Sequence, residues 1–367
     1  MIADKFCDKE GVEKGAGGTV RWHKIIRPAK VTSTTAAGTL KGYADAKYLT
    51  SEKVEVSPSF FTDVFAIDDN VDIQAFFKNE DYMRAIANQQ ALSMDYQAMK
   101  LWSTQCFRHR IDKDTNYQKA VTATTANSAG TSLISTSLTE ADDYWNGGYA
   151  TGINAEGGVY DETSQISDFA TTGDTATVSF ANGITTSSRF RIVAPTGIVA
   201  GDKLSSTGLL DVAGLHQALQ TERYSGGVFN GIIDSEQFRD VWDDTTFLNS
   251  VIYDSSEKLK NYQLYRFFDI MLHVSSQTYR ESATDGSEST TGAVHVAPIF
   301  GANSHKIIPW AHGSGNYGTE WYLVDKPDSG NLTMGARWIS WKSYWAGKVT
   351  RSTSVIGLMT GATSQAL

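Results

Sequence analysis

The stretch from Asn79 to Asp112 reads NEDYMRAIANQQALSMDYQAMKLWSTQCFRHRID and contains neither Gly nor Pro. Apolar and small residues recur in it every three or four positions, at Met83, Ile86, Ala87, Ala91, Met94, Ala98, Leu101, Trp102 and Cys106. This spacing predicts a single helix with one apolar stripe. At a rise of about 1.5 Å per residue the helix would be about 51 Å long, roughly twice what a compact domain needs. We therefore expect a spine helix over residues 79–112.

Both ends of the predicted helix carry the residues that a helix terminus favours. Asn79 can cap its start, with Glu80 and Asp81 in the first turn, and residues 108–110, which are Arg-His-Arg, place positive charge in the last turn. The face opposite the stripe carries mainly amides and hydroxyls, at Gln89, Gln90, Ser93, Gln97, Lys100, Ser103 and Gln105. Such a face suits contact with another protein surface, and it equally suits an ordinary solvent-exposed helix.

Composition places the chain among globular proteins with a large core. It has 367 residues, of which 41% are hydrophobic, enough for two or three subdomains. The formal net charge of -9 argues against a protein whose main task is to grip phosphate backbones, because that task needs a basic surface. Cys7 and Cys106 provide no disulfide framework, and Cys106 falls within the apolar stripe.

The N-terminal sequence favours a protein that stays in the compartment where it is made. Residues 1–18 contain no apolar segment of the kind found in a signal peptide or membrane anchor. No run in the sequence reaches the ~18 apolar residues of a transmembrane helix. We expect a soluble protein in a reducing compartment, without membrane contact.

The first 60 residues predict an arm followed by a projecting hairpin. Residues 1–25 are polar and Gly-rich and end in a strand from Val20 to Ile26, which Arg27-Pro28 terminates. In residues 26–60 a second strand returns through Val54 and Val56. The aliphatic residues larger than Ala between positions 29 and 57 are only Val31, Leu40, Leu49, Val54 and Val56. Two strands with so few apolar side chains cannot form a core of their own. We therefore expect an extended loop that packs against another surface.

The remainder of the chain divides into four predicted regions. Residues 61–149 contain the spine helix and, at 115–138, a poorer helical run. Residues 150–204 form a β insertion whose hairpin turns at Asn182-Gly183. Residues 205–310 alternate helix and strand, which indicates an α/β subdomain. Its predicted elements are a helix capped by Ser206 or Thr207, a strand at 228–233, a helix from Ser235, and strands at 267–274 and 294–300. Residues 311–367 predict closing strands at 321–324, 338–345 and 349–358.

The candidate motifs for catalysis or cofactor binding lack the neighbouring helices and strands that such sites require. The segment from Gly313 to Gly318 reads GSGNYG, but a strand-like sequence follows it and no βαβ unit surrounds it, so we interpret it as a turn. His305 and His312 have Pro309 between them and cannot share a helical face as metal ligands. The acidic pairs at 142–143 and 243–244 are typical of solvated caps. We assign no catalytic, cofactor-binding or metal-binding residues and expect no enzyme activity.

In its order of elements, the chain resembles the major capsid proteins of tailed bacteriophages with the HK97-type fold, in particular those of N4-like phages. The similar segments are Val20-Arg21-Trp22, Arg27-Pro28, Thr39-Leu40-Lys41-Gly42, the spine helix, Val228–Trp242, Phe300–Ile308 and Trp338–Ala346. Two positions depart from the family pattern. Lys41 replaces the usual acid, and Asp234-Ser235 stands where His-Pro is common.

The resemblance implies a structural role and an α+β fold. Its parts would be an N-terminal arm (1–25), an extended loop (26–60), a peripheral subdomain with the spine helix (61–149), the β insertion (150–204), an axial subdomain (205–310) and closing strands (311–367). The chain would self-assemble, as hexamers and pentamers, into an icosahedral shell around phage double-stranded DNA. A separate scaffolding protein, a portal protein at one vertex and decoration proteins are the implied partners. DNA would be touched only weakly and non-specifically, and the protein would be made in the bacterial cytoplasm.

Two other functions remain open from the sequence. The nine Trp and sixteen Tyr residues are also typical of an aromatic-rich carbohydrate-binding or adhesin-type surface protein. The alternating helices and strands of residues 205–300 are also typical of a soluble enzyme, although we find no set of residues that would compose its site.

Overall fold

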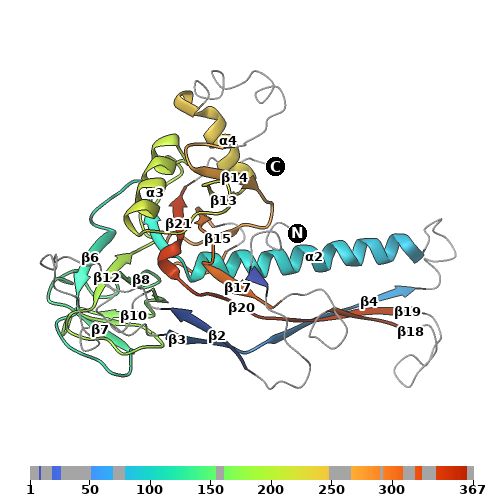
Figure 1. The fold of residues 1–367 in the computed structure, drawn as a ribbon, viewed down its shortest axis with the longest axis horizontal. Coiled ribbons are helices and arrows are strands. Elements are labelled where there is room, and N and C mark those ends of the chain that lie inside the picture. Colours follow the sequence, from blue (N-terminus) through green and yellow to red (C-terminus); the bar gives the residue numbers. More distant parts are fainter. Residues whose placement is uncertain are drawn as a thin grey trace, which may run out of the picture.

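The computed structural model describes residues 8–9, 19–25, 51–68, 79–153, 161–247, 266–289, 292–308, 319–324 and 336–361. Figure 1 shows a long helix, α2, lying along a narrow sheet, with two compact units at the C-terminal end of that helix. One unit combines helices and strands, and the other contains strands only. We refer to them as the α/β unit and the β unit.

The spine helix is shorter than the sequence predicts. Helix α2 runs from Asn79 to Thr104, and its 26 residues correspond to about 39 Å. The chain then forms β5 (Phe107–Arg110), which pairs in parallel with β21 (Val355–Thr360). The basic residues expected in the last helical turn therefore lie in a buried strand. Pairing with β21 overrides the local helical pattern. A short stretch of sequence does not reveal so distant a partner.

The apolar stripe of α2 is confirmed in its C-terminal part. Ile86, Met94, Ala98, Leu101, Trp102 and Cys106 are buried, in one cluster with side chains from the sheet beneath. Met83 and Ala87, which we placed on the stripe, are exposed. Gln90 and Ser103, which we placed on the polar face, are buried. The buried face thus omits the first part of the predicted stripe and includes two positions predicted to be polar and exposed.

The sheet under α2 consists of β18 (Thr319–Val324), β19 (Ala336–Trp345) and β4 (Ser59–Asp68), in that order and antiparallel. Alternation along β19 directs Ile339, Trp341 and Trp345 toward the helix. Trp341 Nε1 donates a hydrogen bond to Gln89 Oε1 at 3.2 Å. Two predicted closing strands are confirmed here, and one side of the sheet is fixed against the spine.

A hairpin of β2 (Val20–Ile25) and β3 (Ser51–Val56) continues this layer. Its inner face places Val20, Trp22 and Val54 in a small core with Ile308 and Ala346. Short strands β1 (Asp8–Lys9), β17 (His305–Ile307) and β20 (Gly347–Val349) form a further sheet. The two strands of the predicted hairpin are confirmed, while residues 26–50 of the predicted extended loop lie outside the described residues.

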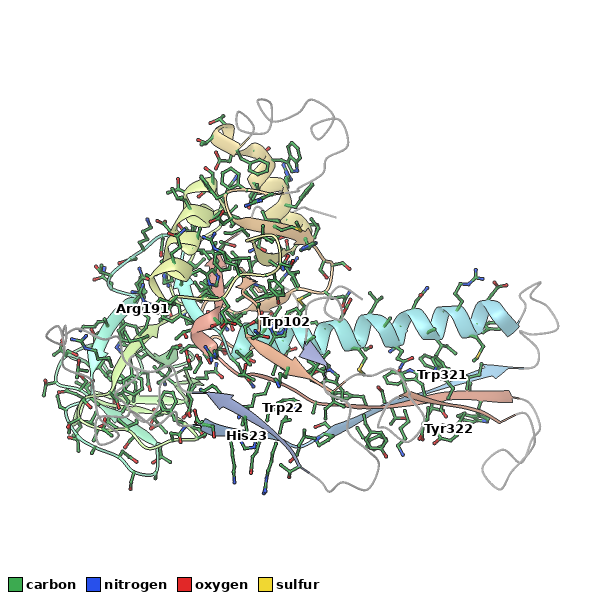
Figure 2. All side chains as sticks on the ribbon, in the orientation of Figure 1. Trp22, His23, Trp102, Arg191, Trp321 and Tyr322 are labelled. Atoms are coloured by element: carbon green, nitrogen blue, oxygen red, sulfur yellow. The ribbon has the colours of Figure 1, made fainter. Side chains whose placement is uncertain are left out.

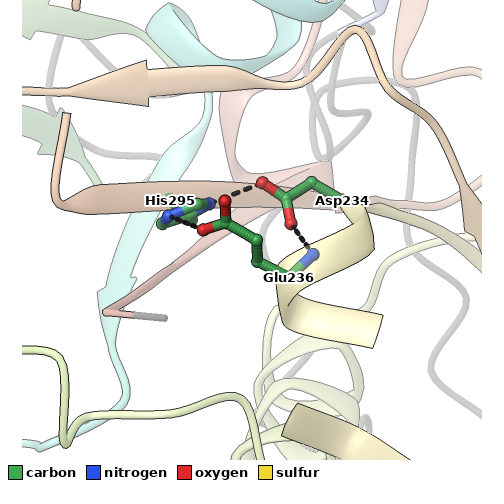
Figure 3. Close-up of side chains that lie close together, drawn as sticks. All are labelled: Asp234, Glu236 and His295. Atoms are coloured by element: carbon green, nitrogen blue, oxygen red, sulfur yellow. Dashed lines mark hydrogen bonds and ion pairs between the residues drawn. The ribbon is translucent and has the colours of Figure 1, made fainter. Parts of the chain in front are cut away.

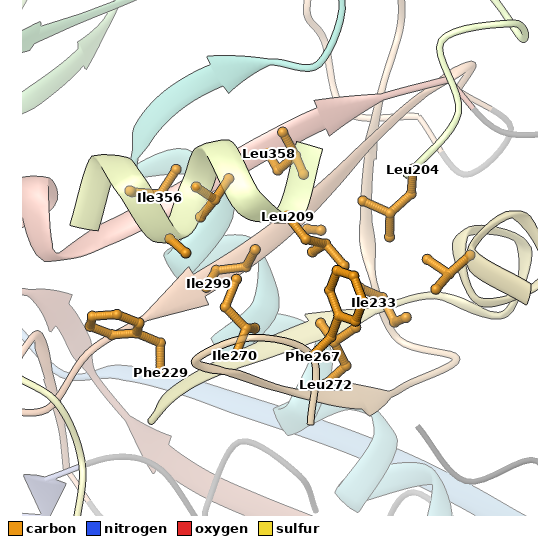
Figure 4. Close-up of a cluster of buried hydrophobic side chains, with 14 of the residues drawn as sticks. Leu204, Leu209, Phe229, Ile233, Phe267, Ile270, Leu272, Ile299, Ile356 and Leu358 are labelled. Carbon is orange, nitrogen blue, oxygen red and sulfur yellow. The ribbon is translucent and has the colours of Figure 1, made fainter. Parts of the chain in front are cut away.

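The α/β unit is built on the largest sheet. Its strand order is β14 (Ile270–Val274), β13 (Phe229–Ile233), β16 (Val294–Phe300), β21 and β5, and β15 (Tyr279–Glu281) also pairs with β16. Helix α3 (Ser206–Ala218) is capped by Ser205, and α4 (Ser235–Asp243) is capped by Asp234. Figure 4 shows the cluster of buried side chains between α3, α4 and the sheet. The helix–strand alternation predicted here is confirmed, and β21 and β5 are added from outside the predicted range.

The β unit begins earlier than the insertion that the sequence indicates. One sheet contains β6 (Gln118–Thr122), β12 (Arg189–Val193), β8 (Tyr149–Gly152) and β9 (Thr163–Gln165). The other contains β10 (Asp168–Ala170), β11 (Thr175–Thr177) and β7 (Ser132–Ile134). Residues 115–138 thus supply strands, and the helical run predicted there is wrong. A short helical turn, η3 (Ser352–Ser354), breaks the predicted strand 349–358 into β20 and β21.

The hairpin predicted at Asn182-Gly183 is also wrong. Strands β11 and β12, which flank this dipeptide, belong to different sheets and do not pair with each other. The chain passes close to the backbone of Ser128 at this point. A Cβ added at Gly183 would lie 2.9 Å from the Ser128 carbonyl oxygen, so the position favours glycine. The dipeptide marks a crossing between sheets.

Candidate functional site

The acidic pairs at 142–143 and 243–244 supply turn and cap residues. Asp142 Oδ1 accepts a hydrogen bond from the Thr171 backbone N–H at 2.8 Å, and Asp143 has a φ of 62° in an exposed turn. Asp244 accepts backbone N–H bonds from Ser206 at 2.7 Å and from Thr246 at 2.8 Å. These bonds satisfy backbone donors, as expected of solvated caps.

His305 is a core residue. Its ring lies edge-on to Trp102 at 4.8 Å and to Phe300 at 5.1 Å between centroids, and Nδ1 bonds Ser304 Oγ at 2.8 Å. His312, its predicted neighbour, lies outside the described residues. The structure therefore gives His305 a packing role between α2 and the large sheet.

Within the described residues, one group of side chains has the composition of a metal site. Asp234, Glu236 and His295 place potential ligand atoms within 4.8 Å of one another (Figure 3). Asp234 caps α4 and Glu236 lies in its first turn, while His295 lies on β16. His295 Nδ1 is 2.6 Å from Asp234 Oδ2, and His295 Nε2 is 3.4 Å from Glu236 Oε2.

The charges in this group are already compensated. Arg280 on β15 lies 2.9 Å from the Asp234 carboxylate and 3.4 Å from that of Glu236. Burial raises the pKa of Asp234, but bonds from His295, the Gln237 backbone and Arg280 outweigh burial and lower that pKa to about 2. Arg280 supplies the positive charge that a metal would bring. We assign the group to fixing α4 against β15 and β16.

A second buried ion pair was missed by sequence analysis. Arg108 on β5 lies 2.6 Å from Glu281 on β15, and neither side chain is exposed. Tyr149 of the β unit donates a hydrogen bond to Glu281 at 3.0 Å, and the Arg108 guanidinium lies 4.1 Å from the centre of the Tyr149 ring. Burial lowers the pKa of Arg108, but Glu281 outweighs it and raises that pKa above its ordinary value. The ion pair itself lies within the large sheet, and Tyr149 connects it to the β unit.

The strongest candidate site is the face of the narrow sheet that points away from α2, which we call the outer face. Strand alternation brings Phe60, Val64, Tyr322 and Trp338 to it, with exposed fractions of 56%, 53%, 46% and 37%. In Figure 2, Tyr322 lies on the side of the sheet opposite the helix. Lys342 shares this face, with its Nζ 4.8 Å from the Tyr344 ring centre and 5.4 Å from that of Phe60.

The chemistry of the outer face is that of a protein contact surface. Exposed aromatic side chains beside a cation are characteristic of interface anchors, and contiguous exposed apolar patches mark interaction sites. Two of its strands, β18 and β19, were predicted from sequence, but β4 was not. The shared face was not predicted either, because it depends on strand register. Among the described residues, no helix is long and apolar enough to cross a membrane.

Comparison with known proteins identifies the fold. No protein-family model matches the sequence, and no curated protein matches it. Among solved structures, the capsid of Ralstonia phage GP4 matches with a TM-score of 0.55 and 12% identity, over 98% of this chain and 87% of that one. The cyanophage Pam1 capsid matches with a TM-score of 0.53 and 10% identity, over 96% and 87%. The cyanophage P-SCSP1u capsid matches with 0.50 and 11%, over 97% and 89%. The chain therefore has the fold of phage capsid proteins.

Proposed function

We propose that this chain, with the fold of phage capsid proteins, is the major capsid protein of a tailed bacteriophage. The observation that carries the proposal is the match to the GP4 capsid over 98% of the chain, since a similarity of that extent covers every unit of the molecule. The chain would self-assemble into an icosahedral shell around double-stranded DNA. Its location would be the virion, after synthesis in the bacterial cytoplasm.

We propose the HK97-type arrangement of parts for this shell subunit, in the variety found in N4-like phages. Residues 1–25 would be the N-terminal arm and 26–60 the extended loop. Helix α2 and the narrow sheet would form the peripheral subdomain, and the α/β unit the axial subdomain. The separation of a long helix–sheet limb from a compact α/β unit supports this assignment (Figure 1).

The described surfaces support a role in assembly. The outer face exposes aromatic side chains, which a lone subunit would leave in water. The net charge of -9 fits a shell that encloses DNA without gripping it. We propose hexamers and pentamers of this chain as capsomers, with a separate scaffolding protein, a portal protein at one vertex and decoration proteins as partners. We propose no enzyme activity for the chain.

Electron microscopy of the purified protein tests the proposal directly. Negative-stain images should contain rings of five or six subunits or closed shells, particularly after co-expression with the neighbouring phage genes. A uniform population of monomers under all these conditions would contradict a shell function.

The exposed aromatic side chains also keep a carbohydrate-binding function open. Trp338 and Tyr322 are exposed on one face, as in many sugar-binding surfaces. A glycan array with the wild-type protein and with Trp338→Ala separates the two functions. A glycan signal that disappears in the variant would favour the adhesin function, whereas assembly without glycan binding would favour the capsid function.

A further inference from the structure

A pocket of about 360 Å³ lies where three parts of the molecule meet. Its walls come from the β2–β3 hairpin, from the β unit and from the segment that follows β19. Because its walls belong to different parts, a movement of one part would change the surroundings of the charged groups on the others. The charged side chains that line it are Lys24, Glu52, Lys53, Asp161, Glu162 and Lys348.

One amide holds two carboxylates together across this junction. The side-chain nitrogen of Asn182 in the β unit donates hydrogen bonds both to Glu52 of β3 and to Glu162 of the β unit. We call these three side chains the carboxylate bridge. Glu162 also accepts the Ala181 backbone N–H at 2.9 Å, so it belongs firmly to the β unit. If the hairpin moved away, the Glu52 carboxylate would therefore move with it, and the Glu162 carboxylate would stay with the β unit.

The lysines around the bridge neutralise its two carboxylates to different extents. Lys24 of β2 lies 3.1 Å from Glu52, with only 5% of its side chain exposed. Asp161 is hydrogen-bonded by the Thr353 hydroxyl and adds negative charge on the β-unit side. Lys53 and Lys348 border the pocket from the hairpin and from β20. Among the described residues no lysine forms an ion pair with Glu162, and the negative charge of Glu52 repels it.

We propose that the carboxylate bridge is a proton-controlled latch that fixes the β2–β3 hairpin to the β unit in mild acid and loosens it as the pH rises. Burial raises the pKa of Glu162 most, hydrogen bonds from Asn182 lower it, and the charge of Glu52 raises it further, leaving it above its ordinary value. Withdrawal of the hairpin would expose Glu162 and remove Glu52, so its pKa would fall. The closed junction thus binds a proton more tightly than the open one, and by linkage protonation favours closure.

The sign of this linkage distinguishes the latch from ordinary acid unfolding. A carboxyl group with a raised pKa contributes stability that is fully present at low pH and is lost as the pH rises through that pKa. Most paired carboxylates act in the opposite direction, as Asp234 does in this molecule. The proposal concerns the single chain and does not depend on its assembly into a shell.

Hydrogen exchange of β3 tests the latch in the purified full-length chain. We expect the backbone amides of residues 51–56, after correction for intrinsic exchange, to open at least about threefold more often at about pH 8 than at about pH 5. Glu162→Gln should remove this dependence and keep the strand protected at both pH values. Glu52→Gln removes the repulsion from the other side but leaves Glu162 buried and takes the carboxylate partner from Lys24, so it should reduce, but not abolish, the pH dependence and should lower the protection at both pH values.

Glu55→Gln is the matched control. Glu55 lies on the same strand, but on the opposite face, where it pairs with Arg21 at 2.8 Å. This variant should keep the pH dependence of the wild type. Protection of residues 51–56 that does not change with pH in the wild type, or that changes equally in Glu162→Gln, would overturn the proposal.

Discussion

At the scale of single residues, Met94 tests the orientation of the spine helix. It is fully buried midway along α2, whereas Leu92, two positions earlier, is 47% exposed. Met94→Asp would place an unpaired carboxylate in the core between α2 and the sheet. We expect it to cost about 3 kcal/mol or more of the free energy of unfolding, measured by urea denaturation. Leu92→Asp should cost less than about 1 kcal/mol. Equal losses in the two variants would mean that the helix faces the other way.

His216 gives the molecule a predictable response to acid. It is buried on α3, where Nδ1 bonds the Thr221 hydroxyl at 3.1 Å and Nε2 bonds the Ile299 carbonyl at 3.2 Å. Burial lowers the pKa of His216 to about 3, against the weaker upward effect of the Ile299 carbonyl. An unfolded histidine has a pKa of about 6.5, so between these values the unfolded chain binds more protons.

The stability that neutral His216 provides is therefore fully present above about pH 6.5 and is lost as the pH falls toward about 3. We expect the melting temperature to decrease over this range in the wild type. His216→Gln keeps a donor for the Ile299 carbonyl but cannot titrate, so its melting temperature should depend less on pH. The remaining slope should come from groups such as His109, whose pKa burial lowers to about 4. An unchanged slope in the variant would assign the acid response to other groups.

At the scale of elements, the sequence predicted the helices and strands whose periodicity lies within one short stretch of the chain. Helix α4, predicted to begin at Ser235, and strands β16 and β19 follow directly from periodicity, whereas the Asp234 cap was not predicted. The end of α2 was not predicted either, because residues 107–110 follow the helical run without a Gly or Pro to end it, yet they pair with β21, about 250 positions away in the chain. The outer face depends on the register of β4, β19 and β18, and a single sequence carries no signal for register between distant strands.

The β unit shows the same limit for a whole module. Its first strands at 118–134 are short and rich in Thr, Ser and Ala, so they have neither a helical nor a clear alternating pattern. What makes them strands is the partner: β6 pairs along its whole length with β12, and β7 with β11. Asn182-Gly183 was misread because a turn signal specifies a bend and not the strands that the bend connects.

Removal of residues 171–200 tests this correction. The segment lies within the predicted β insertion, 150–204. It contains β11 and β12, and β12 lies between β6 and β8. Phe190 and Ile192 of β12 are fully buried. We expect the deletion, bridged by a Gly/Ser linker, to give insoluble protein without a cooperative transition by circular dichroism.

The control for this deletion is a change confined to the exposed turn between β10 and β11. Replacing residues 171–174 by Asn-Gly should leave the β10–β11 pairing and the core intact, because a two-residue turn suits an antiparallel hairpin. A soluble, cooperatively folded deletion variant would restore the view that the segment is peripheral.

At the scale of the whole molecule, the two compact units are joined by buried charge. Arg110 of β5 makes a second connection, in addition to that of Arg108. It donates hydrogen bonds to the carbonyls of Ala194 at 2.7 Å and Thr196 at 2.6 Å, and its guanidinium lies over the Tyr117 ring. Both arginines originate next to the end of α2. The β unit and the α/β unit are thereby joined to each other beside the C-terminal end of the spine.

The hairpin is also where assembly should be most visible. The described strands β2 and β3 pack on Ile308 and Ala346 of the same chain. Residues 29–50, outside the described residues, contain only Val31, Leu40 and Leu49 as aliphatic side chains larger than Ala, so we expect a partner surface to cover them. Lys30, Lys41, Lys47 and Lys53 are potential trypsin sites in this region. Lys53 lies in paired strand β3, whereas the other three lie outside the described residues.

We therefore expect trypsin to cut unassembled subunits first within residues 30–53, with Lys53 cut later than the other three sites because cleavage there requires β3 to separate from β2. Assembled particles should resist cleavage at all four bonds, since a neighbouring subunit would cover them. Mass spectrometry of the first fragments, from capsomers or shells and from monomers at equal subunit concentration, measures the difference. Equal rates in both states, or full protection in a demonstrated monomer, would mean that the arm packs on its own chain and would remove the main mechanical support for a shell function.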